Sequence, residues 1–135
     1  MGTTFTCAAV VEPLIDGETH AVTIHCSTGE KTIPSVVGFR KDKILVGQAA
    51  AKLTATFPES TVYDAKRLLG HRYEDEEVKS DIEFWPFKVG KGKRNDKPLY
   101  KVKMHDGETK DVRPEYVSSY VLQKVRDDAK QRLDT

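Results

Sequence analysis

The sequence predicts a mixed α/β fold, and three observations lead to this class. The first forty residues are rich in β-branched residues and are divided by turn dipeptides, as consecutive strands are. After Gly47 the composition changes to helix-forming residues. From Pro114 onward, apolar residues recur every four positions, which is typical of a long amphipathic helix. The 135 residues are enough for one ordinary domain with one core.

The N-terminal part is predicted to form a β-hairpin. Residues 4–11 and 19–25 are rich in Thr, Val, Ile and Phe, and the Asp-Gly step that ends at Gly17 is typical of a tight turn between strands. Two further short strands are expected at residues 35–39 and 44–46, on either side of a polar tip. The first third of the chain is therefore expected to be mainly β-structure.

Two short helices are predicted in the middle of the chain. The alanine-rich run after Gly47 favours a helix that Pro58 ends, because proline cannot continue the helical hydrogen bonds. A second helix is predicted over residues 61–69. Thr61 and Asp64 fit the pattern in which a threonine and an acidic residue three positions later cap a helix.

An acidic segment and a basic segment come next. Residues 74–83 contain six acids and one lysine and are expected to form a short surface helix or a turn. Residues 88–103 contain seven bases and one acid, interrupted by Gly and Pro, and predict a hairpin with a basic tip. Residues 99–104 and 108–112 continue the alternation across an Asp-Gly step, which predicts another hairpin.

The last helix is predicted to begin at Pro114, since proline is favoured in the first helical turn. Its apolar stripe comprises Val117, Val121, Val125, Ala129 and Leu133. A long helix needs a partner for such a stripe, and we expect it to lie against a sheet. We predict one core shared by the β-rich N-terminal part and this helix, with residues 47–112 as an outlying subdomain that contains Trp85.

Charge and composition limit the classes of partner. With 22 Lys+Arg against 21 Asp+Glu the formal net charge is +1, and no nucleic-acid or membrane partner is expected. The sequence has no apolar run long enough to cross a bilayer and no leader pattern, so a cytoplasmic protein is expected. Cys7 and Cys26 lack metal-ligand or redox spacing and are expected to be reduced and structural.

Several polar motifs carry little chemistry on their own. The Gly-Lys-Gly-Lys run that ends at Lys93 lacks the spacer and the hydroxyl residue of a Walker loop. The four histidines are scattered, and the acidic segment lacks the ligand order of a calcium loop. The basic segment could contact phosphate or an acidic partner, with Tyr100 as a stacking base, but a solvated hairpin is the simpler interpretation. Trp85 is expected in the core.

Three stretches taken together resemble a known family. They are residues 2–7 (Gly-Thr-Thr-Phe-Thr-Cys), residues 62–70 (Val-Tyr-Asp-Ala-Lys-Arg-Leu-Leu-Gly) and residues 81–87, which end in Trp-Pro-Phe. In this order and spacing they resemble the N-terminal ATPase region of the 70-kilodalton heat-shock protein chaperones, the DnaK-type family. The resemblance implies an actin-like, ribonuclease H-like ATPase fold. Residues 1–135 would be the first, incomplete part of its first lobe, with an inserted α+β subdomain.

The same resemblance implies a nucleotide site. A glycine-threonine turn offers backbone N–H groups and hydroxyls to phosphate oxygens. The resemblance assigns the nucleotide contacts to Gly2, Thr3, Thr4, Phe5 and Arg67. Lys66 matches the catalytic lysine of the family, where a cation near the γ-phosphate would stabilise the charge that develops during cleavage.

Cofactors and partners are also implied by the resemblance. In the family an Asp-Leu pair precedes the Gly-Thr-Thr turn, whereas Met1 precedes Gly2 here, and no residue is assigned as a metal ligand. The complete protein is expected to use ATP or ADP with Mg²⁺ and to reach unfolded client peptides and co-chaperones through its other parts. The chain alone is expected to bind ATP weakly or not at all at micromolar concentrations. The alternative is a truncated, non-catalytic structural or interaction fragment.

Overall fold

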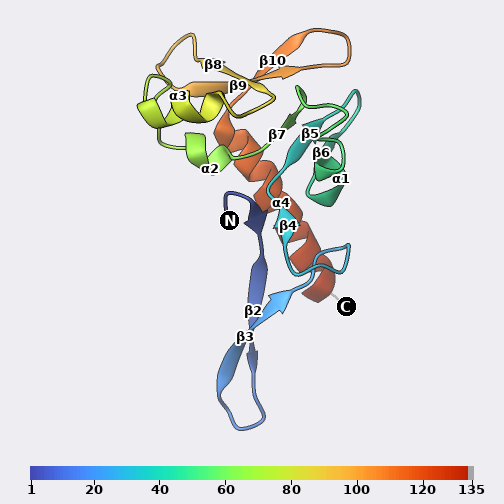
Figure 1. Cartoon of the computed structure of the whole chain (residues 1–135). Coiled ribbons are helices and arrows are strands. Elements are labelled where there is room, and N and C mark those ends of the chain that lie inside the picture. The colour runs from blue at the N-terminus through green and yellow to red at the C-terminus, as the bar shows by residue number, and fades with distance from the viewer. Residues whose placement is uncertain (134–135) are drawn as a thin grey trace.

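The structure is a computed structural model that describes residues 1–133. Its short strands form small antiparallel sheets, and together with the helices they confirm the predicted mixed α/β class. The longest element is the C-terminal helix α4, Pro114–Leu133. Figure 1 shows α4 crossing the molecule, with sheets and short helices around its first half and one hairpin extending away from it. The short elements are therefore arranged around one long helix.

The N-terminal hairpin forms as predicted. Strand β2 (Ala8–Pro13) pairs with β3 (Thr19–Ile24) in an antiparallel register, and Gly17 in the connecting turn has a φ of 88°, which favours glycine. Before it, the two-residue strand β1 (Phe5–Thr6) turns to pair with β4 (Ile33–Pro34) instead. The hairpin therefore stands on a separate pair of strands and projects from the body of the molecule (Figure 1).

A second sheet has β5 (Val37–Phe39) at its centre, between β6 (Ile44–Val46) and a third strand described below. The helix expected after this hairpin is shorter than predicted, because α1 covers only Gln48–Ala51. After α1 the Leu53 and Thr54 N–H groups donate to carbonyls three residues back, at Ala50 and Ala51, so the chain continues as turns and not as an α-helix. The Thr54 hydroxyl also donates to the Ala51 carbonyl at 2.9 Å.

The helix predicted over residues 61–69 is wrong in its first half. Residues Thr61–Val62 form strand β7, which pairs with β5, and only Ala65–Leu68 form helix α2. The Val62 side chain is 0% exposed, so the strand buries apolar surface that a capped helix start would have left in water. Asp64 precedes α2 but makes no capping hydrogen bond.

The acidic and basic segments fold as expected. The acidic segment forms helix α3 (Glu76–Ile82). The basic segment forms β8 (Lys88–Lys91) and β9 (Pro98–Lys103), and β10 (Thr109–Val112) pairs with β9 as the second predicted hairpin. Gly107 in the latter turn has a φ of 86°. The three strands make one antiparallel sheet above α2 and α3 in Figure 1.

The core is one cluster of buried side chains that runs from β4 and β5 through α2 and the β8–β9–β10 sheet to α4. The final helix also touches the base of the first hairpin, as predicted. Lys124 Nζ donates to Ser27 Oγ at 3.1 Å, and Val125 lines a small cavity together with Ile24. Residues 47–112 contribute to this same cluster, and their boundary as a subdomain remains a prediction.

The apolar stripe of α4 is buried only over the first half of the helix. Val117 and Val121 are fully buried, whereas Leu133 is 60% exposed. At 3.6 residues per turn, a four-residue repeat rotates by about 40° at each step and leaves the core-facing side. Asp128 takes the buried position instead, where its Oδ1 accepts a hydrogen bond from Lys124 Nζ. None of the helices within residues 1–133 combines the length and the hydropathy needed to cross a membrane.

Candidate phosphate turn and the α2 corner

The N-terminal residues form a tight turn that Ser35 holds in place. The Gly2 N–H donates to the Phe5 carbonyl at 3.0 Å, and the Ser35 N–H donates to the Thr4 carbonyl at 2.8 Å. The buried Ser35 hydroxyl donates to the Gly2 carbonyl at 2.9 Å. It also lies 2.7 Å from the hydroxyl of Thr6. The backbone carbonyls of the turn are therefore directed toward the protein.

The donors of Thr3 and Thr4 are not used within the turn. Within the described part of the chain, neither the N–H groups nor the hydroxyls of Thr3 and Thr4 have a hydrogen-bond partner. A Cβ atom at Gly2 would overlap the Phe5 carbonyl oxygen, so the turn requires glycine at this position. The Phe5 ring is 54% exposed beside the turn. Such a cluster of unpaired N–H and O–H groups suits an anion with several oxygens.

Lys66 lies on α2, which the core holds firmly. The neighbouring side chains Ala65 and Leu68 are buried, and α2 packs against α4. The Lys66 side chain itself is exposed and has no ion pair within residues 1–133. One face of α2 is therefore buried, and Lys66 on the exposed face carries an ammonium group without an ion pair within residues 1–133. Figure 1 shows the N-terminus beside α4, with α2 above it.

Arg67 is held differently from its neighbour. Its Nε lies 3.8 Å from Asp64 Oδ2, and its Nη1 lies 3.9 Å from Asp81 Oδ2. Asp64 also accepts a hydrogen bond of 2.9 Å from Trp85 Nε1. Asp64 has a φ of 59°, a left-handed conformation that aspartate tolerates better than most residues. This bend turns the chain from β7 into α2, and its carboxylate ties the corner to Trp85.

A cluster of aromatic rings packs beside the bend at Asp64. Trp85 stacks on Phe87, and Phe87 meets Tyr63 and Tyr100 edge to face. The Tyr100 hydroxyl donates to the Tyr63 carbonyl at 2.7 Å. Burial, and to a smaller extent the nearby Asp64 carboxylate, raises the pKa of Tyr100 well above its usual value. The same two causes raise the pKa of Tyr63. Both phenols therefore stay neutral at ordinary pH.

The predicted site residues thus lie in two groups. Gly2, Thr3, Thr4 and Phe5 make up the turn, and Lys66 and Arg67 lie on α2. Within residues 1–133 no hydrogen bond or ion pair joins the two groups. Also within this range, no group of three His, Cys, Asp or Glu side chains is placed to hold a metal ion.

Sequence reasoning missed the residues that position these groups. Ser35 follows Pro34 in a short strand connection, and its bond to a turn 33 residues earlier leaves no local signal. The local pattern marks Asp64 as a cap, but its hydrogen-bond partner Trp85 lies 21 residues away. Asp81, which lies near Arg67, is also distant in sequence. The sequence predicts a core position for Trp85. The structure shows it half-buried, with its ring N–H donating a hydrogen bond to Asp64.

The fold and the candidate site together define a mixed α/β domain with a glycine-threonine turn in which the Thr3 and Thr4 donors have no partner within residues 1–133. The sequence model described as "Hsp70 protein" matches residues 1–135. The chain therefore belongs to the Hsp70 family, whose members are chaperones.

Individual relatives agree with this family. The chain is 40% identical to heat shock cognate 70 kDa protein 3 of Dictyostelium discoideum over 98% of its own length. It is 42% identical to a heat shock 70 kDa protein of Emericella nidulans over 96% of its length. It is 38% identical to a ribosome-associated molecular chaperone of Eremothecium gossypii over 98% of its length. The chain spans about a fifth of each of these relatives, namely 20%, 19% and 20%.

Proposed function

We propose that residues 1–135 serve as the N-terminal portion of the nucleotide-binding domain of an ATP-dependent chaperone. In this proposal the chain is the first part of an actin-like lobe, and hydrolysis of ATP controls the binding of unfolded peptides elsewhere in the complete protein. One observation carries the proposal. In a chain of the Hsp70 family, the amide and hydroxyl donors of Thr3 and Thr4 have no protein partner within residues 1–133.

The proposed binding role falls to the N-terminal turn. The Thr3 and Thr4 donors would hold the β- and γ-phosphates without adding positive charge, while Ser35 keeps the turn closed from behind. Arg67 would line the nucleotide cleft, and Phe5 would back the turn. Mg²⁺ is proposed to accompany the phosphates of ATP and to neutralise their charge.

Lys66 is the proposed catalytic residue. Its helix is held in place by the buried side chains of Ala65 and Leu68, so the backbone that carries the ammonium group is fixed. A cation placed near the γ-phosphate would stabilise the charge that develops in the transition state. Arg67 is engaged by two carboxylates, whereas Lys66 has no ion pair within the described residues. Lys66 is therefore the cation of this pair that is available to a bound phosphate.

The second candidate function is a non-catalytic structural or interaction fragment. It is favoured by the separation of the predicted site residues, because within residues 1–133 no hydrogen bond or ion pair joins the N-terminal turn to α2. Few contacts are available within the chain to offset the entropy lost when ATP is immobilised.

A chimaera distinguishes the two candidates. Residues 1–135 would replace the matched segment of the Emericella nidulans relative, and single-turnover hydrolysis of ATP would be measured beside the parent protein. The proposal predicts a rate within about tenfold of the parent. A folded chimaera that binds no ATP, or hydrolyses it no faster than buffer, would support the non-catalytic alternative. The 135-residue chain alone, measured by calorimetry with Mg²⁺, is expected to show no micromolar binding.

A further inference from the structure

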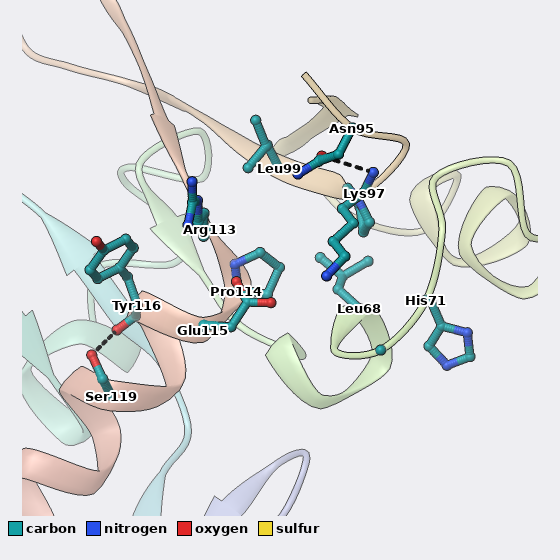
Figure 2. Close-up of a pocket in the computed structure, with 12 residues that line it drawn as sticks. Leu68, His71, Asn95, Lys97, Leu99, Arg113, Pro114, Glu115, Tyr116 and Ser119 are labelled. Atoms are coloured by element: carbon teal, nitrogen blue, oxygen red, sulfur yellow. Dashed lines mark hydrogen bonds between the residues drawn. The ribbon is translucent and has the colours of Figure 1, made fainter. Parts of the chain in front are cut away.

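A groove lies between α2, the β8–β9 hairpin and the start of α4, and the proposed nucleotide residues do not line it. Its volume is ≈ 510 Å³, which falls in the range of sites for small organic ligands. Leu68 and His71 line one side, and Pro114 and Tyr116 line the other. Figure 2 shows the Lys97 side chain reaching from the hairpin into the space between Leu68 and Pro114.

The polar groups of the groove are mainly hydrogen-bond donors. Lys97 and Arg113 both line it, and neither forms an ion pair within residues 1–133. Asn95 uses its Oδ1 atom to accept from the Lys97 N–H at 3.1 Å, which leaves its amide N–H groups available. His71 has Asp75 as its partner at 3.2 Å, and Glu115 is the one carboxylate among the lining residues.

Lys97 and Arg113 lie just outside the strands of the β8–β9–β10 sheet. Lys91, Lys101 and Lys103 within these strands each pair with a carboxylate, whereas Lys88 and Lys110, like the two groove cations, have no ion pair within residues 1–133. In Figure 2 the Lys97 side chain lies beside Leu68 and Arg113 lies above Pro114, so the two cations line different sides of the groove. A concave surface that carries cations raises the local concentration of anions.

Apolar residues also line the groove. Leu68, Pro98 and Leu99 come from the core side, and Pro114 and Tyr116 come from α4. An inorganic anion would use the cations alone and leave this surface in contact with water. A ligand that also covers the apolar side gains the free energy of burying it.

We propose that this groove is a binding site for a small organic anion, in which a phosphate or carboxylate group is attached to an aromatic or aliphatic body. Lys97, Arg113 and the Asn95 amide would hold the anionic group, and the apolar lining would hold the body. The proposal does not depend on nucleotide binding, because none of the residues involved belongs to the N-terminal turn and neither Lys66 nor Arg67 lines the groove.

The test uses the 135-residue chain and three probes: phenyl phosphate, inorganic phosphate and phenol. Amide chemical shifts of Gly70, Leu99 and Ser119 report on the groove. Phenyl phosphate is expected to shift them saturably, while inorganic phosphate and phenol bind at least about tenfold more weakly, since each lacks one half of the interaction. Lys97→Gln is expected to raise the dissociation constant for phenyl phosphate about tenfold, the effect of one charge-assisted hydrogen bond.

Lys93→Gln is the matched control. Lys93 is an exposed lysine in the same connection between β8 and β9, but it does not line the groove. This variant should bind phenyl phosphate within about twofold of the unchanged chain. Equal losses in the two variants, or equal affinity for phenyl phosphate and inorganic phosphate, would overturn the proposal. The absence of saturable shifts at the groove residues in the folded chain would overturn it too.

Discussion

The two hairpins that the sequence predicts with equal ease differ sharply in how they are packed. Among the described residues the β2–β3 hairpin pairs with no third strand, and of its residues only Ile24 is buried. The β8–β9 hairpin gains β10 as a third strand and buries Val89, Tyr100 and Val102 in the core. The alternation of apolar and polar residues along two strands, with turn-forming residues between the strands, determines that a hairpin forms. The elements that cover its face determine how much stability it contributes.

The largest expected effect concerns the packed hairpin. Tyr100→Ala should lower the free energy of unfolding by about 3 to 5 kcal/mol, because it opens a cavity and removes the hydrogen bond to Tyr63. Tyr116→Ala is the matched control, since that ring is 57% exposed and should cost less than about 1 kcal/mol. Urea unfolding of both variants measures the difference. Similar losses would contradict the assigned core.

Alkaline pH gives the next largest effect. The pKa of Tyr100 is raised in the folded chain, so its contribution to stability is fully present below the unfolded pKa of about 10. This contribution is lost as the pH rises through the higher folded-state pKa, with a slope of up to about 1.4 kcal/mol per pH unit. Tyr100→Phe removes the group, and its free energy of unfolding should fall less steeply between about pH 10 and pH 11. Parallel slopes for the two proteins would be evidence against a buried phenol.

The turns provide the smallest and most local comparison. Gly107 and Gly17 both have positive φ angles, of 86° and 88°, and alanine at either position costs about 1 kcal/mol of backbone strain. Gly107→Ala should lower the global free energy of unfolding by about this amount, because β9 and β10 belong to the core. Gly17→Ala should leave it unchanged and instead speed hydrogen exchange in β2 and β3. A global loss from Gly17→Ala would show that the projecting hairpin is coupled to the core.

Local signals account for what the sequence predicted. The β2–β3 and β9–β10 hairpins have glycine at the turn position that needs positive φ, and the last helix begins at Pro114 as its pattern indicates. Non-local strand pairing accounts for the elements that the sequence did not predict. Thr61 and Val62 join β5 in a sheet, and this pairing with a strand more than twenty residues away replaces the expected helix start.

The candidate site follows the same division. The Gly2–Thr4 turn and Lys66 stand out by resemblance within short stretches. The residues that hold these groups in place do not stand out in the sequence. Ser35 bonds to Gly2 across 33 residues, and Trp85 bonds to Asp64 across 21. Such contacts depend on the assembled core and have no periodicity to detect. Asp128 is a further case, since a carboxylate at a core-facing helix position is unexpected from composition.

The comparison of the two hairpins also bears on function. The proposed phosphate turn lies at the root of the projecting hairpin, next to β1, whereas Lys66 lies on α2, which packs on α4 within the well-buried side. The proposal therefore places the catalytic cation on a rigid element and the phosphate contacts at the edge of a less supported one. Lys66, the proposed catalytic cation, should therefore affect the chemical step more than ATP binding.

The most direct test measures ATP binding and single-turnover hydrolysis in the chimaera with Lys66→Ala, beside Lys52→Ala as a control exposed lysine at the end of another short helix. Loss of a preorganised cation should lower the hydrolysis rate by roughly 100-fold or more and leave ATP affinity within a few-fold, and Lys52→Ala should change neither. A Lys66→Ala chimaera that hydrolyses ATP at nearly the unchanged rate would contradict the account of this chain as part of a working nucleotide-binding domain with Lys66 at its catalytic centre.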